Sequence, residues 1–168
     1  MPRSSNAIGT PPARSGATLA KALEGQLPAD ECRQIATIPE RYVEHAHADD
    51  WAAVANLYHP EALRLMPDVP PAEGREAIRA ALARLLGSAG GVRLAEFDVA
   101  IAEAELLDET VYVRAEYRLI RKPLGAPGDS FSLAGPYVNH LRRDPHSTWR
   151  IWRQVVGRAH PIAGPALS

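Results

Sequence analysis

The chain has 168 residues, a length that suits one domain of ordinary size. Hydrophobic residues make up 46% and charged residues 23%, which is typical of a soluble globular protein and excludes a collagen-like, mucin-like or wholly disordered chain. The basic and acidic residues number 19 and 20, for a formal net charge of -1, so the basic excess typical of nucleic-acid-binding proteins is missing.

The sequence also gives no sign of a membrane or of an oxidising compartment. No stretch approaches the ~18 consecutive apolar residues of a membrane span, and the opening MPRSSNAIGTPPARSG has no apolar run of signal-peptide length. The single cysteine, Cys32, cannot form an internal disulfide. We therefore expect a cytoplasmic protein that contacts neither a membrane nor nucleic acid.

Residues 1–28 are expected to form a flexible N-terminal extension that is punctuated by prolines. Leu19 and Leu23 provide an apolar pair at helical spacing, enough for one short helix that needs a surface to dock on. We expect the pair to dock on a partner subunit or over the mouth of a pocket. The extension should be dispensable for folding of the domain at residues 29–160, which residues 161–168 follow as a tail.

The domain is expected to begin with helices. Thr37 and Glu40 fit a capping box, in which the threonine hydroxyl accepts a free backbone N–H and the glutamate reaches back. This pattern predicts a helix over residues 38–48. Asp49 or Asp50 then caps the next helix.

That second helix is expected over residues 51–59, where apolar side chains recur at helical spacing until Pro60 ends it. A short strand over residues 62–66 and the proline-rich loop MPDVPPAEG follow. A third helix over residues 75–86 ends at Gly87.

The second half of the chain alternates like β-strands. In the segment 92–106 the apolar phase changes between Leu94 and Phe97, which predicts a bulge near Ala95 and Glu96. Three further strands are expected over residues 110–120, 131–142 and 149–158. Three helices followed by antiparallel strands predict an α+β domain with the helices on one face of a sheet.

Several familiar chemical motifs are absent from the sequence. It contains no glycine loop for phosphate, no cysteine pair for zinc and no GxSxG nucleophile motif. His45 and His47 are two residues apart on an expected helix, so they point to different sides. We therefore expect no metal site and no cofactor.

The segments RYVEHAHADDWAAVANLYHPEALRLMPDVPPAEGREAIRAALARLL and STWRIWRQVV resemble the front half and the last strand of the nuclear-transport-factor-two-like superfamily. That superfamily includes ketosteroid isomerases, SnoaL-type polyketide cyclases and limonene epoxide hydrolases. The resemblance covers about residues 35–160 and implies a cone: a curved, mainly antiparallel sheet around a pocket that three helices close. It also implies a homodimer through the outer face of the sheet.

Compared with ketosteroid isomerases, Tyr42 falls where that family keeps an oxyanion-hole tyrosine, and Asn139 falls at the second donor. An amide donates a hydrogen bond without a raised pKa, and Tyr137 shares the strand face of Asn139. The proton-shuttling aspartate of the family falls at Met66, which cannot carry a proton. Asp68 lies two residues on and could replace it, although an aspartate before Val-Pro-Pro is typical of a turn.

A second comparison gives different candidates. The segment MPDVPPAEGREAI resembles limonene epoxide hydrolases, and their two acid-bearing strand motifs correspond to Arg114–Glu116 and Trp152–Gln154. Gln154 can orient a water molecule but cannot take its proton. The alternation of the strand over residues 110–120 also fits Arg114 and Glu116 on a solvated face, and which face lines the pocket stays open.

Three functions are compatible with these patterns. The first is an isomerase- or cyclase-type enzyme that acts without a cofactor on an apolar, ring-containing small molecule by acid–base and oxyanion chemistry, with an epoxide hydrolase as its variant. The second is a binding module with the same cone, and the third is a scaffold with a filled interior. A pocket carboxylate or histidine with a shifted pKa separates the enzyme from the binding module.

The residues proposed for chemistry are Tyr42, Asn139, Asp68, Arg114, Glu116 and Gln154. The residues proposed to contact the small molecule are Met66, Tyr137, Trp152, Trp51 and Tyr58.

Overall fold

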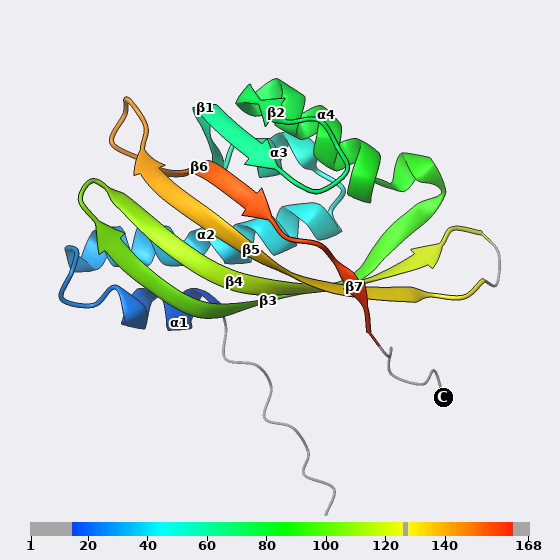
Figure 1. Ribbon diagram of the computed structural model, residues 1–168, viewed down its shortest axis with the longest axis horizontal. Coiled ribbons are helices and arrows are strands. Elements are labelled where there is room, and N and C mark those ends of the chain that lie inside the picture. The colour runs from blue at the N-terminus through cyan, green and yellow to red at the C-terminus, as the bar shows by residue number, and fades with distance from the viewer. Residues whose placement is uncertain (1–14, 126–127, 163–168) are drawn as a thin grey trace, which may run out of the picture.

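The computed structural model describes residues 15–125 and 128–162. Its helices are α1 (Ser15–Ala22), α2 (Ala29–His47), α3 (Trp51–Ala55) and α4 (Gly74–Leu86), with a short 3-10 turn η1 (Ser88–Gly90) after the last. The strands are β1 (Tyr58–Leu65), β2 (Ala72–Glu73), β3 (Val92–Leu107), β4 (Thr110–Pro123), β5 (Phe131–Arg143), β6 (Trp149–Val156) and β7 (His160–Pro161). Figure 1 shows α2 crossing behind a curved sheet, with α4 along the edge that β1 and β2 form.

The sheet has the order β2-β1-β6-β5-β4-β3, with β7 added to β5. Every pair of neighbours is antiparallel except β1 and β6, which run parallel. The register of β3 against β4 slips between Leu94 and Glu96, at the position of the predicted bulge. The expected α+β fold with a mainly antiparallel, curved sheet is confirmed.

The predicted start of the first long helix is wrong. Helix α2 begins at Ala29 and continues through Pro39. The hydroxyl of Thr37 donates to the backbone oxygen of Gln34 at 2.7 Å, inside the helix, so the residues of the expected capping box cap nothing. Ile35 and Ile38 are buried on either side of that point, and this continuous apolar face outweighs the local start signal.

The second helix is shorter than predicted. Asp50 caps it as expected, since its carboxylate accepts the backbone N–H of Ala53 at 2.9 Å. The helix ends at Ala55, however, and Tyr58 already belongs to β1. Helical spacing of apolar residues misled the prediction here, because parallel pairing with β6 provides hydrogen bonds that a longer helix would forgo.

Helix α1 differs from the expectation for residues 1–28. Leu19 and Leu23 are only 2% and 0% exposed, and they pack into the same core as α2. A side chain at Gly16 would meet the backbone oxygen of Ala36, so this glycine lets the two helices approach closely. The leucine pair therefore docks on the chain's own core. Residues 1–14 and 163–168 lie outside the described residues, and the domain boundary at residue 28 stays a prediction.

Strand β4 separates the two faces of the sheet cleanly. Val113 and Leu119 are buried on the face toward the helices, whereas Arg114, Glu116 and Arg118 are exposed on the other. This settles which face of the strand points inward. The homodimer expected through the outer face stays a prediction.

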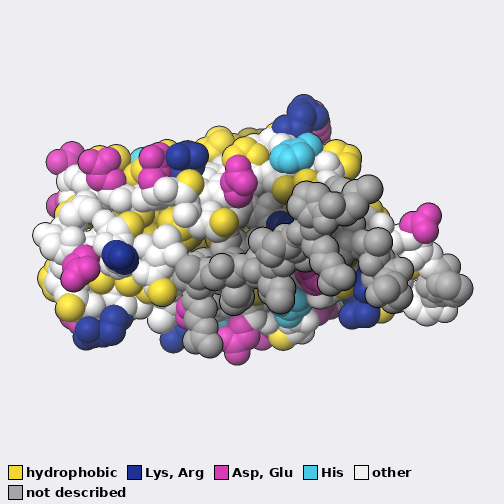
Figure 2. All heavy atoms as spheres, turned by 90° about the horizontal axis from the view of Figure 1, so that it is seen from below, with side chains coloured by type: hydrophobic (Ala, Val, Ile, Leu, Met, Phe, Trp, Pro, Cys, Tyr) yellow, Lys and Arg dark blue, Asp and Glu magenta, His cyan; other side chains and the backbone are white. Residues whose placement is uncertain are grey.

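In the described ranges, no helix is both long and apolar enough to cross a membrane. Where described atoms form the face shown in Figure 2, acidic and basic side chains are interspersed.

Candidate functional site

A cavity of about 200 Å³ lies between the inner face of the sheet and the helices. Leu19 of α1, Tyr42 of α2 and Leu86 of α4 contribute to its wall, so three helices border the cavity. Most of its lining is apolar, including Ile38, Phe97, Val113, Leu119, Leu141 and Val156. As far as the structure describes this lining, it contains no aspartate, glutamate or histidine.

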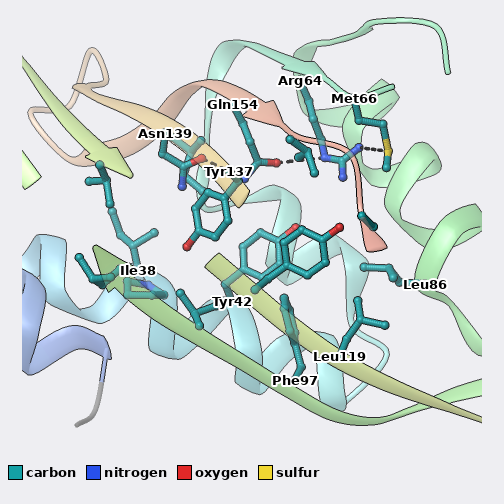
Figure 3. A pocket seen from close by; sticks show the side chains of 18 of the residues that line it. Ile38, Tyr42, Arg64, Met66, Leu86, Phe97, Leu119, Tyr137, Asn139 and Gln154 are labelled. Carbon is teal, nitrogen blue, oxygen red and sulfur yellow. Dashed lines mark hydrogen bonds between the residues drawn. The ribbon is translucent and has the colours of Figure 1, made fainter. Parts of the chain in front are cut away.

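A chain of hydrogen bonds crosses the polar wall of the cavity (Figure 3). Gln154 Oε1 accepts from the hydroxyl of Tyr58 at 2.7 Å and from Arg64 Nε at 3.0 Å. Gln154 Nε2 then donates to Asn139 Oδ1 at 3.0 Å, across the paired strands β6 and β5. This network fixes the orientation of both amides, and it leaves the Asn139 amide nitrogen free to donate into the cavity.

The same series of hydrogen bonds determines where the hydroxyl proton of Tyr42 points. Its hydroxyl oxygen lies 3.4 Å from that of Tyr58. Because Tyr58 gives its own proton to Gln154, Tyr42 is the donor in this contact. The Tyr42 proton therefore points toward Tyr58, and a ligand oxygen would have to divert it.

The other phenols around the cavity are neutral donors. Burial raises the pKa of Tyr58, Tyr137 and Tyr117, and for Tyr117 the nearby charge of Arg64 opposes the rise only in part. All three therefore keep their protons at neutral pH. Tyr137 points into the cavity in Figure 3 and makes no hydrogen bond to another described side chain.

Gly135 makes room for the ring of Tyr117. Tyr117 lies opposite Gly135 in the pairing of β4 with β5. A Cβ atom at residue 135 would come within 2.9 Å of the Tyr117 hydroxyl oxygen. The glycine thus lets the Tyr117 ring lie across β5 and leaves room in the cavity.

Arg64 is a buried cation in this wall, and the sequence analysis missed it. It is 7% exposed, and within the described ranges no carboxylate lies within 4.0 Å of its guanidinium. Its other contact is from Nη1 to Met66 Sδ at 3.4 Å. Strand alternation could have revealed it, because Arg64 precedes Met66 by two residues on the face expected to line the pocket.

The SnoaL-like domain family matches residues 40–151. The chain belongs to this family. No curated protein matches the chain.

Solved structures show the same fold in distant proteins. A conserved protein from Planctomyces limnophilus DSM 3776 is 24% identical, with a TM-score of 0.67 over 80% of this chain and 98% of that one. A ketosteroid isomerase-like protein from Erwinia carotovora atroseptica SCRI1043 is 17% identical, with a TM-score of 0.60 over 76% and 93% of the two chains. A protein from Catenulispora acidiphila in complex with S-DNPA is 16% identical, with a TM-score of 0.58 over 77% and 94%. At these identities the likeness shows the fold alone.

In this SnoaL-like domain, five of the residues singled out from the sequence line one cavity, as Figure 3 shows. They are Tyr42, Met66, Tyr137, Asn139 and Gln154. Tyr58 lies fully buried beside them and takes part in the hydrogen-bond chain.

Asp68, Arg114 and Glu116 are not brought to the cavity. The Asp68 side chain is 75% exposed, pairs with Arg158 at 3.0 Å and has the positive φ of a turn residue. Arg114 pairs with Glu103 at 3.0 Å on the outer face of the sheet, where Glu116 is also exposed. Arg114 and Glu116 therefore lie on a solvated face of the strand, which was one of the two interpretations of its alternation.

The two tryptophans also lie elsewhere. Trp51 is buried in the core, and its indole N–H donates to Asp49 at 2.6 Å. Trp152 packs against the guanidinium groups of Arg142 and Arg153, and it is not part of the cavity lining.

A bulge explains the position of Trp152. Leu141 pairs with Ile151, but its neighbour His140 pairs with Arg153, so Trp152 is an extra residue in β6. The bulge reverses the alternation, which allows both Ile151 and Gln154 to face the cavity.

No group of three or more histidine, cysteine, aspartate or glutamate side chains gathers within the described residues in a way that could hold a metal ion.

Proposed function

We propose that this SnoaL-like domain binds an apolar, ring-containing small molecule and holds one of its oxygens against Asn139 and Tyr137. The observation that carries the proposal is an apolar cavity with a few hydrogen-bond donors that the described side chains leave unused. The volume, about 200 Å³, is below the ~300–1,000 Å³ of sites for drug-sized ligands, which favours a molecule of one or two rings. The S-DNPA complex of a similarly folded protein supports small-molecule binding by this fold.

The chemistry of the lining favours binding and polarisation over proton transfer. Donors in a dry cavity stabilise negative charge that develops on a ligand oxygen. Removal of a proton from carbon needs a base, however, and the described lining holds neither a carboxylate nor a histidine. Burial raises the pKa of the Tyr117 and Tyr137 phenols in this lining, so both stay protonated. The binding module is therefore the better-supported alternative.

The epoxide-hydrolase variant receives no support from the geometry. Its carboxylate would have to come from Glu116, which is exposed on the outer face. At the second acid position Gln154 is neutral; its amide oxygen accepts from Tyr58 and Arg64, and its amide nitrogen donates to Asn139.

The two-ring ketone 2-tetralone tests the proposal, because it offers one carbonyl oxygen and acidic C–H groups. We expect calorimetry to give a dissociation constant on the order of 100 μM. Asn139→Leu should weaken binding about tenfold by removing the donor, whereas the control Arg114→Met, on the outer face, should bind as the unmodified protein does. Absence of binding would overturn the proposal.

Exchange of the α-hydrogens of 2-tetralone in D₂O, followed by NMR, separates binding from catalysis. Without a base in the cavity, we expect the protein to leave the exchange rate near that of buffer. An acceleration of about 100-fold or more that Asn139→Leu removes would show catalysis and contradict a purely binding role.

A further inference from the structure

Resting on the proposed function, we propose that the ligand carries a carboxylate on its ring system and that this carboxylate binds the guanidinium of Arg64. Among the described residues, the positive charge of Arg64 has no anionic partner. Arg64 is 7% exposed, yet its hydrogen-bonding partners are the neutral amide of Gln154 and the thioether of Met66. A thioether is a weak acceptor, so most of the five N–H donors of Arg64 have no strong partner among the described residues.

The other groups packed around Arg64 do not neutralise it. Tyr58 and Tyr117, whose pKa values respond to the charge of Arg64, are themselves uncharged because burial keeps them protonated. Gln154 lies where a carboxylate would form an ion pair, but it is an amide. An unpaired charge in a buried site is unfavourable, and an anion that enters the site removes that penalty.

A second cation makes the imbalance larger. Arg121 also lines the cavity, and its Nε is buried without a hydrogen-bond partner within the described ranges. Its guanidinium carbon lies 5.5 Å from the centroid of the Phe131 ring, whereas no described aromatic ring stacks on the guanidinium of Arg64. The described lining thus holds two positive charges and no negative one.

Two partly buried arginines elsewhere in the fold are paired with carboxylates. Arg143 bonds to Glu31, and Arg150 bonds to Asp144. A guanidinium presents its donors in a planar fork that matches a carboxylate, so a ring-bound carboxylate is the ligand group that completes Arg64 in the same way.

The experiment compares 2-naphthoate with the neutral 2-naphthamide by calorimetry at pH 7.5, and the readout is the ratio of their affinities. We expect the unmodified protein to prefer the carboxylate by about tenfold or more. Arg64→Met should reduce the ratio to about twofold or less. Arg114→Met removes one positive charge from the outer face and should keep the full preference, which controls for net charge.

Gln154→Glu provides a second, independent variant. The new carboxylate would lie where Gln154 Oε1 now lies, 3.0 Å from Arg64 Nε, and would compete with the ligand for the charge. We expect the preference for 2-naphthoate to disappear here too, so the inference stays testable if Arg64→Met fails to fold.

The outcomes are distinct. Equal binding of the two naphthalene compounds by the unmodified protein would overturn the carboxylate inference and leave the proposed function intact. A preference that survives both Arg64→Met and Gln154→Glu, or that Arg121→Met alone removes, would overturn the assignment to Arg64. Failure of 2-naphthoate, 2-naphthamide and 2-tetralone alike to bind would overturn the inference together with the proposed function.

Discussion

Charged side chains are buried both at the β5–β6 turn and in the cavity wall. At the turn they have charged partners, whereas in the cavity wall they have only neutral ones among the described residues. At the turn, Asp144 accepts the backbone N–H groups of His146 and Thr148 at 2.9 and 3.0 Å and pairs with Arg150 at 3.1 Å. Beside it, Glu31 accepts from the indole N–H of Trp149 at 2.6 Å.

In the cavity wall the charge of Arg64 meets only neutral groups among the described residues, and the amide nitrogen of Asn139 has no acceptor there. Strands β5 and β6 contribute residues to both regions. In our proposal, the polar groups at the turn are satisfied by neighbouring residues and hold the fold together, whereas Arg64 and Asn139 are left for a ligand. Substitutions in the two regions should therefore act on different properties.

The largest expected effect on stability is at helix α1, which lies at the same end of the molecule as the β5–β6 turn (Figure 1). Leu23 is fully buried. Leu23→Ala should lower the free energy of unfolding by about 3 kcal/mol through lost burial and the cavity left behind, measured by urea denaturation. A loss below about 1 kcal/mol would show that α1 is an accessory, as the sequence alone suggested.

Asp144→Asn should lower the free energy of unfolding by about 2 kcal/mol, because an uncharged amide cannot accept from Arg150 and from the turn as a carboxylate does. Burial by itself raises the pKa of Asp144, but the hydrogen bonds from Thr148, Arg150 and His146 outweigh it, and the net pKa lies below the ordinary value. A lowered pKa stabilises the fold above the unfolded-state pKa, and this contribution is lost as the pH falls.

The stability of the unmodified protein should therefore decrease more steeply than that of Asp144→Asn as the pH falls from about 5 to about 2. Chemical denaturation at a series of pH values measures the two curves. Parallel curves would mean that the turn carboxylate does not stabilise the fold through its charge.

Features of the fold that depend on neighbouring residues could be predicted from the sequence, whereas features that depend on tertiary contacts could not. The end of α4 before Gly87 and the β3 bulge depend on neighbouring residues, and both were predicted correctly. Asp50, which caps α3, is one of the two aspartates that the sequence offered. The start of α2 and the placement of Tyr58 in β1 depend on tertiary packing and on pairing with β6. Local signals predicted both of these incorrectly.

The site shows the same division. Tyr42 and Asn139 could be located from a family pattern, and both line the cavity. Trp152 was placed at the site by the resemblance to an epoxide-hydrolase strand motif, but the bulge in β6 turns it away from the cavity. Arg64 could not be recognised as unpaired, because whether a carboxylate lies nearby depends on residues far apart in the chain.

In the cavity wall, Gly135→Ala should reduce both the stability of the fold and the affinity for a ligand, each by about 1–2 kcal/mol. The new Cβ would lie within 2.9 Å of the Tyr117 hydroxyl oxygen and push that ring into the cavity. We expect a modest loss of stability together with weaker binding of 2-tetralone, measured by thermal unfolding and calorimetry. Unchanged ligand affinity would show that Tyr117 does not border the ligand.

The smallest change in stability is expected for Arg64→Met. Removal of an unpaired buried charge should leave the free energy of unfolding within about 1 kcal/mol, or raise it. A loss of about 2 kcal/mol or more in urea denaturation would place Arg64 with Asp144 among the structural groups and weaken the distinction between the two regions.

A crystal structure of the protein with bound 2-naphthoate tests most directly whether a ligand completes the charges of the cavity. We expect the rings between Phe97 and Leu119, and a carboxylate oxygen at about 2.7–3.0 Å from a guanidinium nitrogen of Arg64. A ligand whose carboxylate points to solvent, with Arg64 still bound only to Gln154 and Met66, would contradict the claim.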